Sequence, residues 1–394
     1  FNVDLGQTVN LYVPSDAANL LNLVHSEQSS INGILNSIHN GQIGGNIFFL
    51  NPHGLIVGSE GRLNVGSLTA ISPTTEFMNT FFDSDNNPSA SAVNQVLLGE
   101  VPINASGLIT VSGTINAIGG IRLSSGGVQN TGTITSGAVF TGSSPDFSDV
   151  VNIAGLASGS AMSTENGSIV ITAHNDVKNS GTIASNGGDV ILQAGRKIEI
   201  TGGELDAQGA VTGGDGDISL IAAQSDHVTS REANANTGIH VANAKLKGKD
   251  ISLQASADAQ YELSGLSSLV LGNVDNEIGY SLEANVALAQ AAAASEILLG
   301  NGSVLQATGD IVLQANAAAT AKTDMKDIST GKELSISFLY GQIDSQAAVD
   351  VQDGAQITAS NLSIKAKNQA TLDINAQSTS LEGESVETAI AVTK

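Results

Sequence analysis

Apolar and polar residues alternate along short segments of the chain, and one such segment recurs through its second half. It reads Gly188-Asp-Val-Ile-Leu-Gln-Ala194 in one copy and Gly309-Asp-Ile-Val-Leu-Gln-Ala315 in another. Each copy is a turn residue or pair followed by a strand of about five residues. The copies start at Gly167, Gly188, Gly216, Lys249, Gly309 and Ser360. A strand-turn unit that repeats every few tens of residues predicts a solenoid or a propeller.

The spacing of the copies separates these two architectures. Gly188 follows Gly167 by 21 residues and Gly216 follows Gly188 by 28, whereas a propeller blade needs about 40. We therefore predict an all-β, right-handed parallel β-helix with an N-terminal cap and short excursions from the helix. Alternation places Val190 and Leu192 on one face of their strand and Ile191 on the other, so one set must be buried.

Two stretches interrupt the repeat, residues 256–296 and residues 316–348. Both lie between good copies, so we expect them to be longer coils or a side hairpin packed on the helix. The first contains the run Ala284–Ala294, whose composition favours a helix. Its flanks alternate in the manner of strands, so we predict a strand there.

The N-terminal third contains a different pattern. Residues Ser72–Phe82 combine a capping residue, an early Pro and Glu, and spaced phenylalanines, which predicts a short helix. The following Asp83–Ser89 is rich in Asp, Asn and Ser and is expected to be a surface loop. Together these residues predict an excursion from the solenoid.

Composition narrows the class of protein. Asp and Glu total 38 and Lys and Arg total 15, giving a formal charge of −23, which argues against nucleic acid and anionic lipid as partners. Cysteine is absent, so disulfides and thiolate metal sites are excluded. Trp is absent and aromatic residues make up 3%, which suits a narrow interior of aliphatic side chains. No apolar run reaches the ~18 residues of a membrane span, and we expect a monomer.

No group of residues predicts chemistry. The histidines stand at 25, 39, 53, 174, 227 and 240 without metal-ligand spacing. Gly213–Ile218 is similar to a calcium-binding nonapeptide but lacks its second Asp and tandem copies. Asp206, Asp215 and Asp217 could form a glycosidase-like acid group, but turns rich in Gly favour solvated acids. We predict no catalytic, cofactor or metal residues and no enzyme; a polysaccharide-active β-helix enzyme is the competing class.

The most distinctive stretch is Gly44–Ser59, which reads Gly-Gly-Asn-Ile-Phe-Phe-Leu-Asn-Pro-His-Gly-Leu-Ile-Val-Gly-Ser. Ile47–Leu50 is predicted to be a buried strand and Leu55–Val57 the next one. Between them, Asn51, Pro52, His53 and Gly54 predict a β-turn with Pro at its second position. Asn51 can hydrogen-bond the local backbone, and Gly54 can adopt a positive φ.

This stretch resembles the secretion domain of two-partner secretion exoproteins, the filamentous-haemagglutinin-like adhesins of Gram-negative bacteria. Their hallmark is an Asn-Pro-Asn-Gly turn after an apolar strand; here His53 stands at the third position, and a second Asn-Pro-Asn-Leu element is absent. The context resembles the large leukotoxin-like or biofilm-matrix branch. The resemblance implies a secretion domain at residues 1–155, continuous with a β-helical shaft at residues 156–394, and Asn51, Pro52, His53 and Gly54 as secretion-motif residues.

The resemblance further implies an exported filamentous adhesin, secreted and present at the cell surface. Its partner in export is an outer-membrane β-barrel transporter, and its shaft presents regions that bind polysaccharide or a surface receptor. A delivery stalk of a contact-dependent toxin is an alternative. Residues 1–4 already read as strand and residues 391–394 lack an evident cap, so we expect a processed piece of a larger protein.

Overall fold

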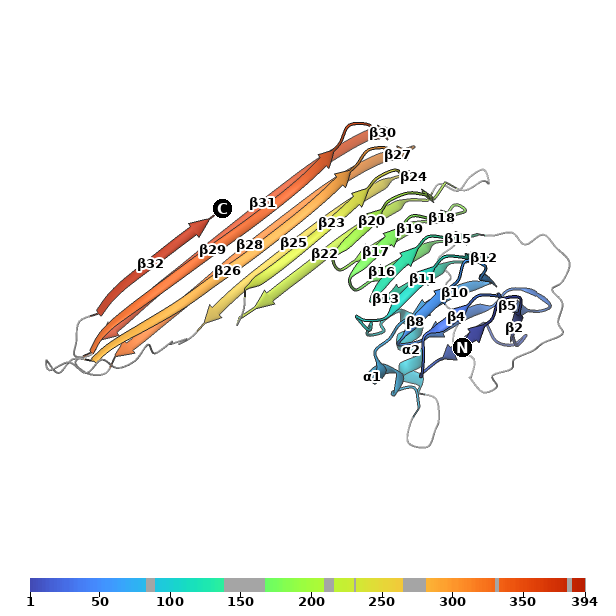
Figure 1. Cartoon of the computed structure of the whole chain (residues 1–394), viewed down its shortest axis with the longest axis horizontal. Helices are drawn as coiled ribbons and strands as arrows, with labels where there is room; N and C mark the ends of the chain where they lie inside the picture. Colours follow the sequence, from blue (N-terminus) through green and yellow to red (C-terminus); the bar gives the residue numbers. More distant parts are fainter. Residues whose placement is uncertain are drawn as a thin grey trace.

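The computed structural model describes residues 1–82, 89–137, 167–208, 216–229, 232–264, 281–329, 333–380 and 385–393. The chain winds through three parallel sheets in a fixed order, one strand from each sheet per coil, and successive coils stack along one axis (Figure 1). This arrangement is a parallel β-helix, so the predicted fold class is confirmed. In the described part, the helices are too short to cross a membrane.

The three sheets, which we call sheets A, B and C, have the following strands. Sheet A contains β1 (Asn2–Val3), β4 (Ser29–Ile31), β8 (Gly54–Val57), β11 (Leu108–Val111), β14 (Gly127–Asn130), β17 (Asp176–Asn179), β20 (Lys197–Ile200), β23 (Ala233–Val241), β26 (Ser281–Leu299), β29 (Glu333–Val351) and β32 (Ser385–Thr393). Sheet B contains β2 (Thr8–Val13), β5 (Ile34–His39), β9 (Arg62–Val65), β12 (Thr114–Ala117), β15 (Thr133–Ser136), β18 (Thr182–Ser185), β21 (Glu204–Asp206), β24 (Lys245–Gly248), β27 (Val304–Ala307) and β30 (Gln356–Thr358), and β6 (Gln42–Ile43) pairs antiparallel with β5. Sheet C contains β3 (Asn19–Leu23), β7 (Asn46–Leu50), β10 (Ser67–Ile71), β13 (Ile121–Ser125), β16 (Ile169–Ala173), β19 (Val190–Ala194), β22 (Ile218–Val228), β25 (Ile251–Ser264), β28 (Asp310–Ser329) and β31 (Asn361–Ser380).

The interior consists of aliphatic columns that run along the axis. In sheet C, β16, β19 and β22 pair in register, so that Ile169, Val190 and Ile218 stack directly. Val190 and Leu192 are fully buried, whereas Ile191 points outward and is half-buried. The alternation of the repeated phrase therefore selects the inner face as expected.

The Asp of the repeated phrase also has a structural task, which its strand pattern did not predict. At the corners before the sheet C strands β16, β19, β22 and β25, one side-chain oxygen accepts the backbone N–H of the corresponding residue in the next coil. The acceptors are Ser168, Asp189, Asp217 and Asp250, and the donors are Asp189, Asp217, Asp250 and Asp310, at 3.2, 2.9, 3.1 and 2.7 Å. We call this row the aspartate ladder.

Two helices form the predicted excursion, between β10 and β11. α1 (Thr75–Met78) and α2 (Ala90–Leu98) pack Phe77 and Val96 against the outer face of sheet C, together with Phe81 from the segment after α1. The helix expected at residues 72–82 is present but shorter, and its cap is Thr74 rather than Ser72, because the Thr74 hydroxyl accepts the Phe77 N–H. The predicted loop at residues 83–89 lies outside the described residues except for its last member. α2 was not predicted.

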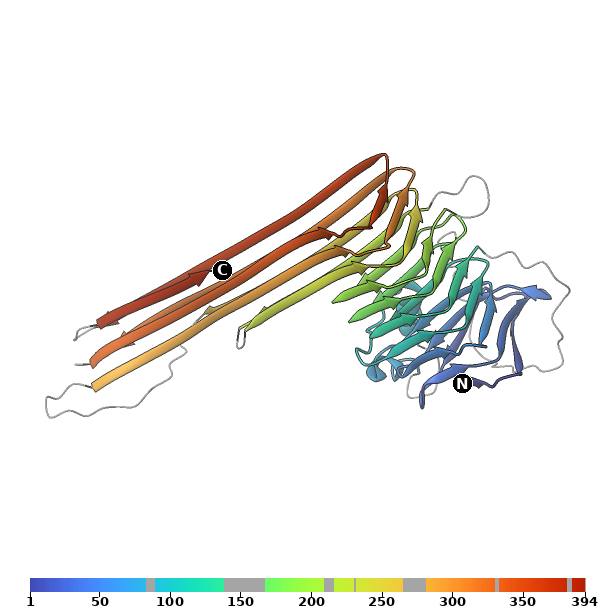
Figure 2. The same ribbon diagram turned by 45° about the horizontal axis from the view of Figure 1, so that its top comes forward.

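The C-terminal coils carry a second structure, which we call the wing: the parts of β22, β23, β25, β26, β28, β29, β31 and β32 that run beyond the coils. Sheet C strands lengthen from 5 residues in β19 to 20 in β28. The long strands of sheets A and C form two layers that extend far from the coils in both views (Figures 1 and 2). The interruptions at 256–296 and 316–348 are thus long coils. The alternative of a hairpin packed on the helix is wrong, because β25 and β26 belong to different sheets.

The wing has an alanine core. The buried residues between its two layers include Ala233, Ala235, Ala257, Ala259, Ala289, Ala291, Ala293, Ala317, Ala319 and Ala321. The Ser295 hydroxyl in sheet A donates to the Ala255 carbonyl in sheet C at 2.9 Å, so a serine side chain can span the gap between the layers. The run Ala284–Ala294 lies in β26; it is strand, as predicted, because small side chains fit this thin interior.

Candidate functional site

The Asn51–Gly54 segment forms the corner between β7 in sheet C and β8 in sheet A. The Gly54 N–H donates to the Asn51 carbonyl at 3.0 Å, and the His53 N–H donates to Asn51 Oδ1 at 2.9 Å. Gly54 has a φ of +93°. A four-residue turn closed at its first carbonyl, with Pro second and Gly fourth, has the residue preferences of a type I turn. The predicted turn and both flanking strands are therefore present.

Asn51 connects this corner to the coils on both sides of it. Its side chain is 1% exposed, and Nδ2 donates to the Glu27 carbonyl at 2.7 Å and to Ser29 Oγ at 2.9 Å in the preceding coil. Its backbone N–H donates to the Ile71 carbonyl of the following coil at 3.0 Å. Replacement of this buried amide is costly, because the fully buried Ser29 would lose its hydrogen-bond partner and the turn would lose the bonds to Glu27 and His53.

Gly54 is required by space as well as by its φ angle. It pairs with Leu108 of β11, and a Cβ at Gly54 would stand 2.0 Å from the Leu108 carbonyl oxygen. That oxygen belongs to the backbone and cannot rotate away. Glycine is therefore the residue that this corner can accept without moving a strand.

His53 differs from the other three residues because it is exposed. Within the part of the chain that the structure describes, its backbone N–H is hydrogen-bonded but its ring has no hydrogen bond or ion pair. The hydrogen bonds of the turn consequently involve the backbone of His53 and not its imidazole.

A second turn repeats the pattern of the first one coil later. Asn104–Gly107 precedes β11, the Ser106 N–H donates to Asn104 Oδ1 at 3.0 Å, and the Gly107 N–H donates to the Asn104 carbonyl at 3.0 Å. Asn104 Nδ2 then donates to the Pro52 carbonyl at 2.8 Å. The Asn104 side chain of the second turn therefore binds the backbone of the first turn.

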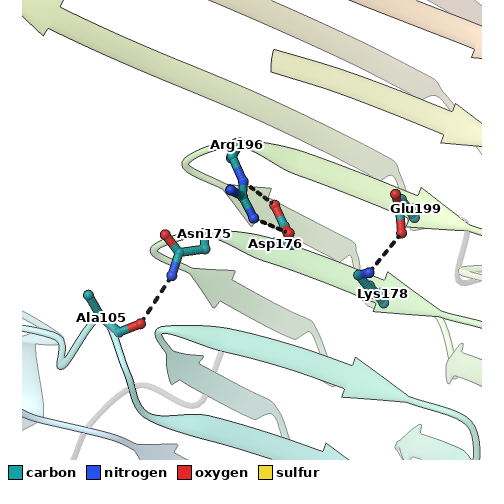
Figure 3. Close-up of polar contacts among 6 residues, drawn as sticks. All are labelled: Ala105, Asn175, Asp176, Lys178, Arg196 and Glu199. Carbon is teal, nitrogen blue, oxygen red and sulfur yellow. Dashed lines mark hydrogen bonds and ion pairs between the residues drawn. The ribbon is translucent and has the colours of Figure 1, made fainter. Parts of the chain in front are cut away.

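A third asparagine continues this series. Asn175 Nδ2 donates to the Ala105 carbonyl at 3.0 Å (Figure 3). The Asn175 side chain passes the intervening coil at Gly126, where a Cβ would stand 2.2 Å from the same Ala105 oxygen. We call Asn51, Asn104 and Asn175 the asparagine stair; each donates to a backbone carbonyl of an earlier coil.

The sequence pointed to Asn51 and Gly54 but not to the two later asparagines. The sequence does contain the necessary signal, because Asn51-Pro-His-Gly54 and Asn104-Ala-Ser-Gly107 share Asn and Gly at the same separation, each followed by Leu. Glu27 and Ser29 carry no such signal, since only the coil geometry brings them to Asn51.

Ion pairs lie beside the stair on the outer face of sheet A. Arg196 binds Asp176 through two hydrogen bonds, Nε to Oδ1 at 2.9 Å and Nη2 to Oδ2 at 2.6 Å, and Lys178 lies 3.3 Å from Glu199 (Figure 3). The hydrogen bonds from Arg196 lower the pKa of Asp176 below its usual value, against the opposing effect of partial burial. These contacts connect neighbouring coils.

The other candidate groups are dispersed. His227 lies 3.2 Å from Asp258, and His240 lies 3.1 Å from Glu296, each pair connecting adjacent strands. The carboxylates of Asp206 and Asp217 accept the backbone N–H groups of Gln208 and Asp250. Asp215 and Gly213–Gly214 lie outside the described residues. Among the described residues, no three His, Asp or Glu side chains gather in a group that could hold a metal ion.

Comparison with known proteins gave the following result. No family model matches the chain, and no curated protein matches it. Among solved structures, the chain is similar to the HMW1 secretion domain from Haemophilus influenzae, with 16% identity, coverage of 93% of this chain and 91% of that one, and a TM-score of 0.42. A likeness of this size establishes no function, so the functional assignment depends on the turn and the coils around it.

Proposed function

We propose that the chain is part of an exported filamentous adhesin, with a two-partner secretion domain at residues 1–155 and a shaft at residues 156–394. Asn51, Pro52, His53 and Gly54 are the secretion motif. The observation that supports the proposal is the Asn51–Gly54 turn at a corner of a parallel β-helix, in which the Asn51 side chain is buried and hydrogen-bonded through both its nitrogen and its oxygen. The partner in export is an outer-membrane β-barrel transporter.

The architecture supports export of an unfolded chain that folds on the far side. Each coil pairs with the one before it, so folding can proceed from the first coil onward as the chain emerges. The chain contains no cysteine, and therefore no disulfide could form early and obstruct passage. Coil-by-coil folding and the lack of disulfides both suit a β-helix that is exported as an unfolded chain.

The shaft has a presenting role in this proposal. The stacked coils and the wing make an extended body (Figure 2), and the net charge of −23 disfavours self-association. The secreted protein acts at the cell surface, where the shaft displays regions that bind extracellular polysaccharide or a surface receptor. The proposed function is binding rather than catalysis.

The decisive experiment measures secretion with the cognate transporter after Asn51→Ala. Asn36→Ala is the matched control, because Asn36 is also a buried asparagine, bonded to Asn10 and Asn64, and lies outside the turn. Asn51→Ala is expected to abolish export while Asn36→Ala retains most of it. Equal secretion of both variants would remove the assignment of the motif.

Two further measurements complete this test. His53→Ala leaves the backbone hydrogen bonds of the turn in place, so export that falls while stability is unchanged would show that the transporter reads the imidazole itself. Incubation with acidic and neutral polysaccharides should give no new reducing ends and no unsaturated products. Appearance of either product would favour a polysaccharide-active enzyme over an adhesin.

A further inference from the structure

The partners of the Asn51–Gly54 turn become available at different times along the chain. Glu27 and Ser29, which bind the Asn51 side chain, precede it in the sequence. Asn104, which binds the Pro52 carbonyl, follows that residue by 52 positions. A chain that folds from its N-terminus therefore completes one side of the turn long before the other.

The excursion between β10 and β11 determines when Asn104 arrives. Its two ends join through an antiparallel bridge between Pro73 and Ile103, and the Asn104 N–H donates to the Ser72 carbonyl at 2.9 Å. Asn104 consequently reaches Pro52 only when the segment that contains both helices has closed on itself. The side chain is then fixed, because its Oδ1 accepts the Ser106 N–H.

We propose that Asn104 is a positioning residue that locks the Asn51–Gly54 turn, so that the turn remains open to a binding partner until the helical excursion has closed. The identity of that partner as the secretion transporter rests on the proposed function. The lock itself is a property of this chain: one amide N–H group, donated from a residue outside the motif to the carbonyl of its proline.

The first test compares two substitutions of equal chemistry. Asn104→Asp keeps the oxygen that accepts from Ser106 but removes the Nδ2 donor to Pro52. Asn175→Asp removes the donor to Ala105 at the next step of the stair and adds the same charge. Hydrogen exchange of purified protein, resolved at residues 51–57, is expected to accelerate about two- to tenfold in Asn104→Asp, the effect of one hydrogen bond, and to stay unchanged in Asn175→Asp.

A second readout separates a lock from general loosening. Folded Asn104→Asp should bind the soluble periplasmic region of the transporter more tightly than the unchanged protein, whereas folded Asn175→Asp should bind as the unchanged protein does. If hydrogen exchange at residues 51–57 is unchanged in Asn104→Asp, or is accelerated equally in Asn104→Asp and Asn175→Asp, Asn104 does not lock the turn. Faster exchange without tighter binding overturns the control of partner access, and the Asn51→Ala secretion assay judges the proposed function separately.

A third measurement covers the case in which Asn104→Asp does not fold. In the unchanged protein at rising urea concentration, residues 51–57 should exchange through the same opening event as residues 102–107, because the two turns form one cooperative unit. Opening of residues 51–57 at a lower urea concentration than residues 102–107 would overturn the proposal.

Discussion

Replacement of Gly54 by alanine tests whether the corner between β7 and β8 requires glycine at that position. At a φ of +93°, a residue with a Cβ is strained by about 1–3 kcal/mol. The new methyl group would also stand 2.0 Å from the Leu108 carbonyl oxygen, which forces β8 and β11 apart. Overpacking of this kind typically costs a further ~1–3 kcal/mol.

The matched control is Gly41→Ala, in the turn between β5 and β6. Gly41 has a φ of +76°, and a Cβ there meets nothing within 4 Å, so this variant carries strain without a clash. Both substitutions reduce the freedom of the unfolded chain equally. The difference between the two free energies of unfolding therefore isolates the contact with Leu108.

The assay is urea unfolding followed by far-ultraviolet circular dichroism. Because repeat arrays can unfold in parts, hydrogen exchange at β8 and β11 accompanies it. We expect Gly54→Ala to be destabilised by about 1–3 kcal/mol more than Gly41→Ala, with faster exchange at β8. Equal stability of the two variants would show that the strand pair can absorb the methyl group, and the argument from space would be refuted.

Four other outcomes are expected. Leu192→Ala, in a fully buried column, should lower the free energy of unfolding by about 2–5 kcal/mol in the same urea assay. Asp217→Ala should cost about 0.5–1.5 kcal/mol because it removes an acceptor of the aspartate ladder, whereas Asp217→Asn should cost less because its oxygen can accept the same N–H. Ala291→Leu should accelerate hydrogen exchange in the wing but not in the coils, since the alanine core has no room for it. Because the pKa of Asp176 is lowered in the folded protein, its ion pair with Arg196 should add to the free energy of unfolding. This stabilisation is complete above the ordinary pKa of 3.8 and is lost as the pH falls through the lower pKa of the folded state. The pair is partly exposed and should supply at most about 1 kcal/mol, and Asp176→Asn should remove that part of the acid dependence.

The sequence predicted the coils because their physics is local and repetitive. Alternation places Val190 and Leu192 on one face of their strand, and the recurrence of the phrase predicts that the strands of successive copies pair with one another. The Asn51–Gly54 turn was predictable for a similar reason, since Pro and Gly restrict the backbone directly. What a residue does to its immediate neighbours can be read from the chain.

Contacts between coils were less accessible to prediction. Asn104 reaches Pro52 across 52 positions, and that separation depends on the length of an excursion with no repeat to measure it. The two-layer arrangement of the wing was missed for another reason. Alternation predicted strands there, but only the burial of alanines from sheets A and C in one cluster shows that they fill a thin interior between two layers.

The unequal length of the coils has a kinetic consequence. Asp189 reaches Ser168 after 21 residues, whereas Asp310 reaches Asp250 only after 60. The entropy lost on closing a loop grows with the logarithm of its length, so the longer closure costs about 0.9 kcal/mol more before any compensating contact forms. The coil that joins Asp250 to Asp310 is therefore expected to close more slowly than the coil that joins Ser168 to Asp189.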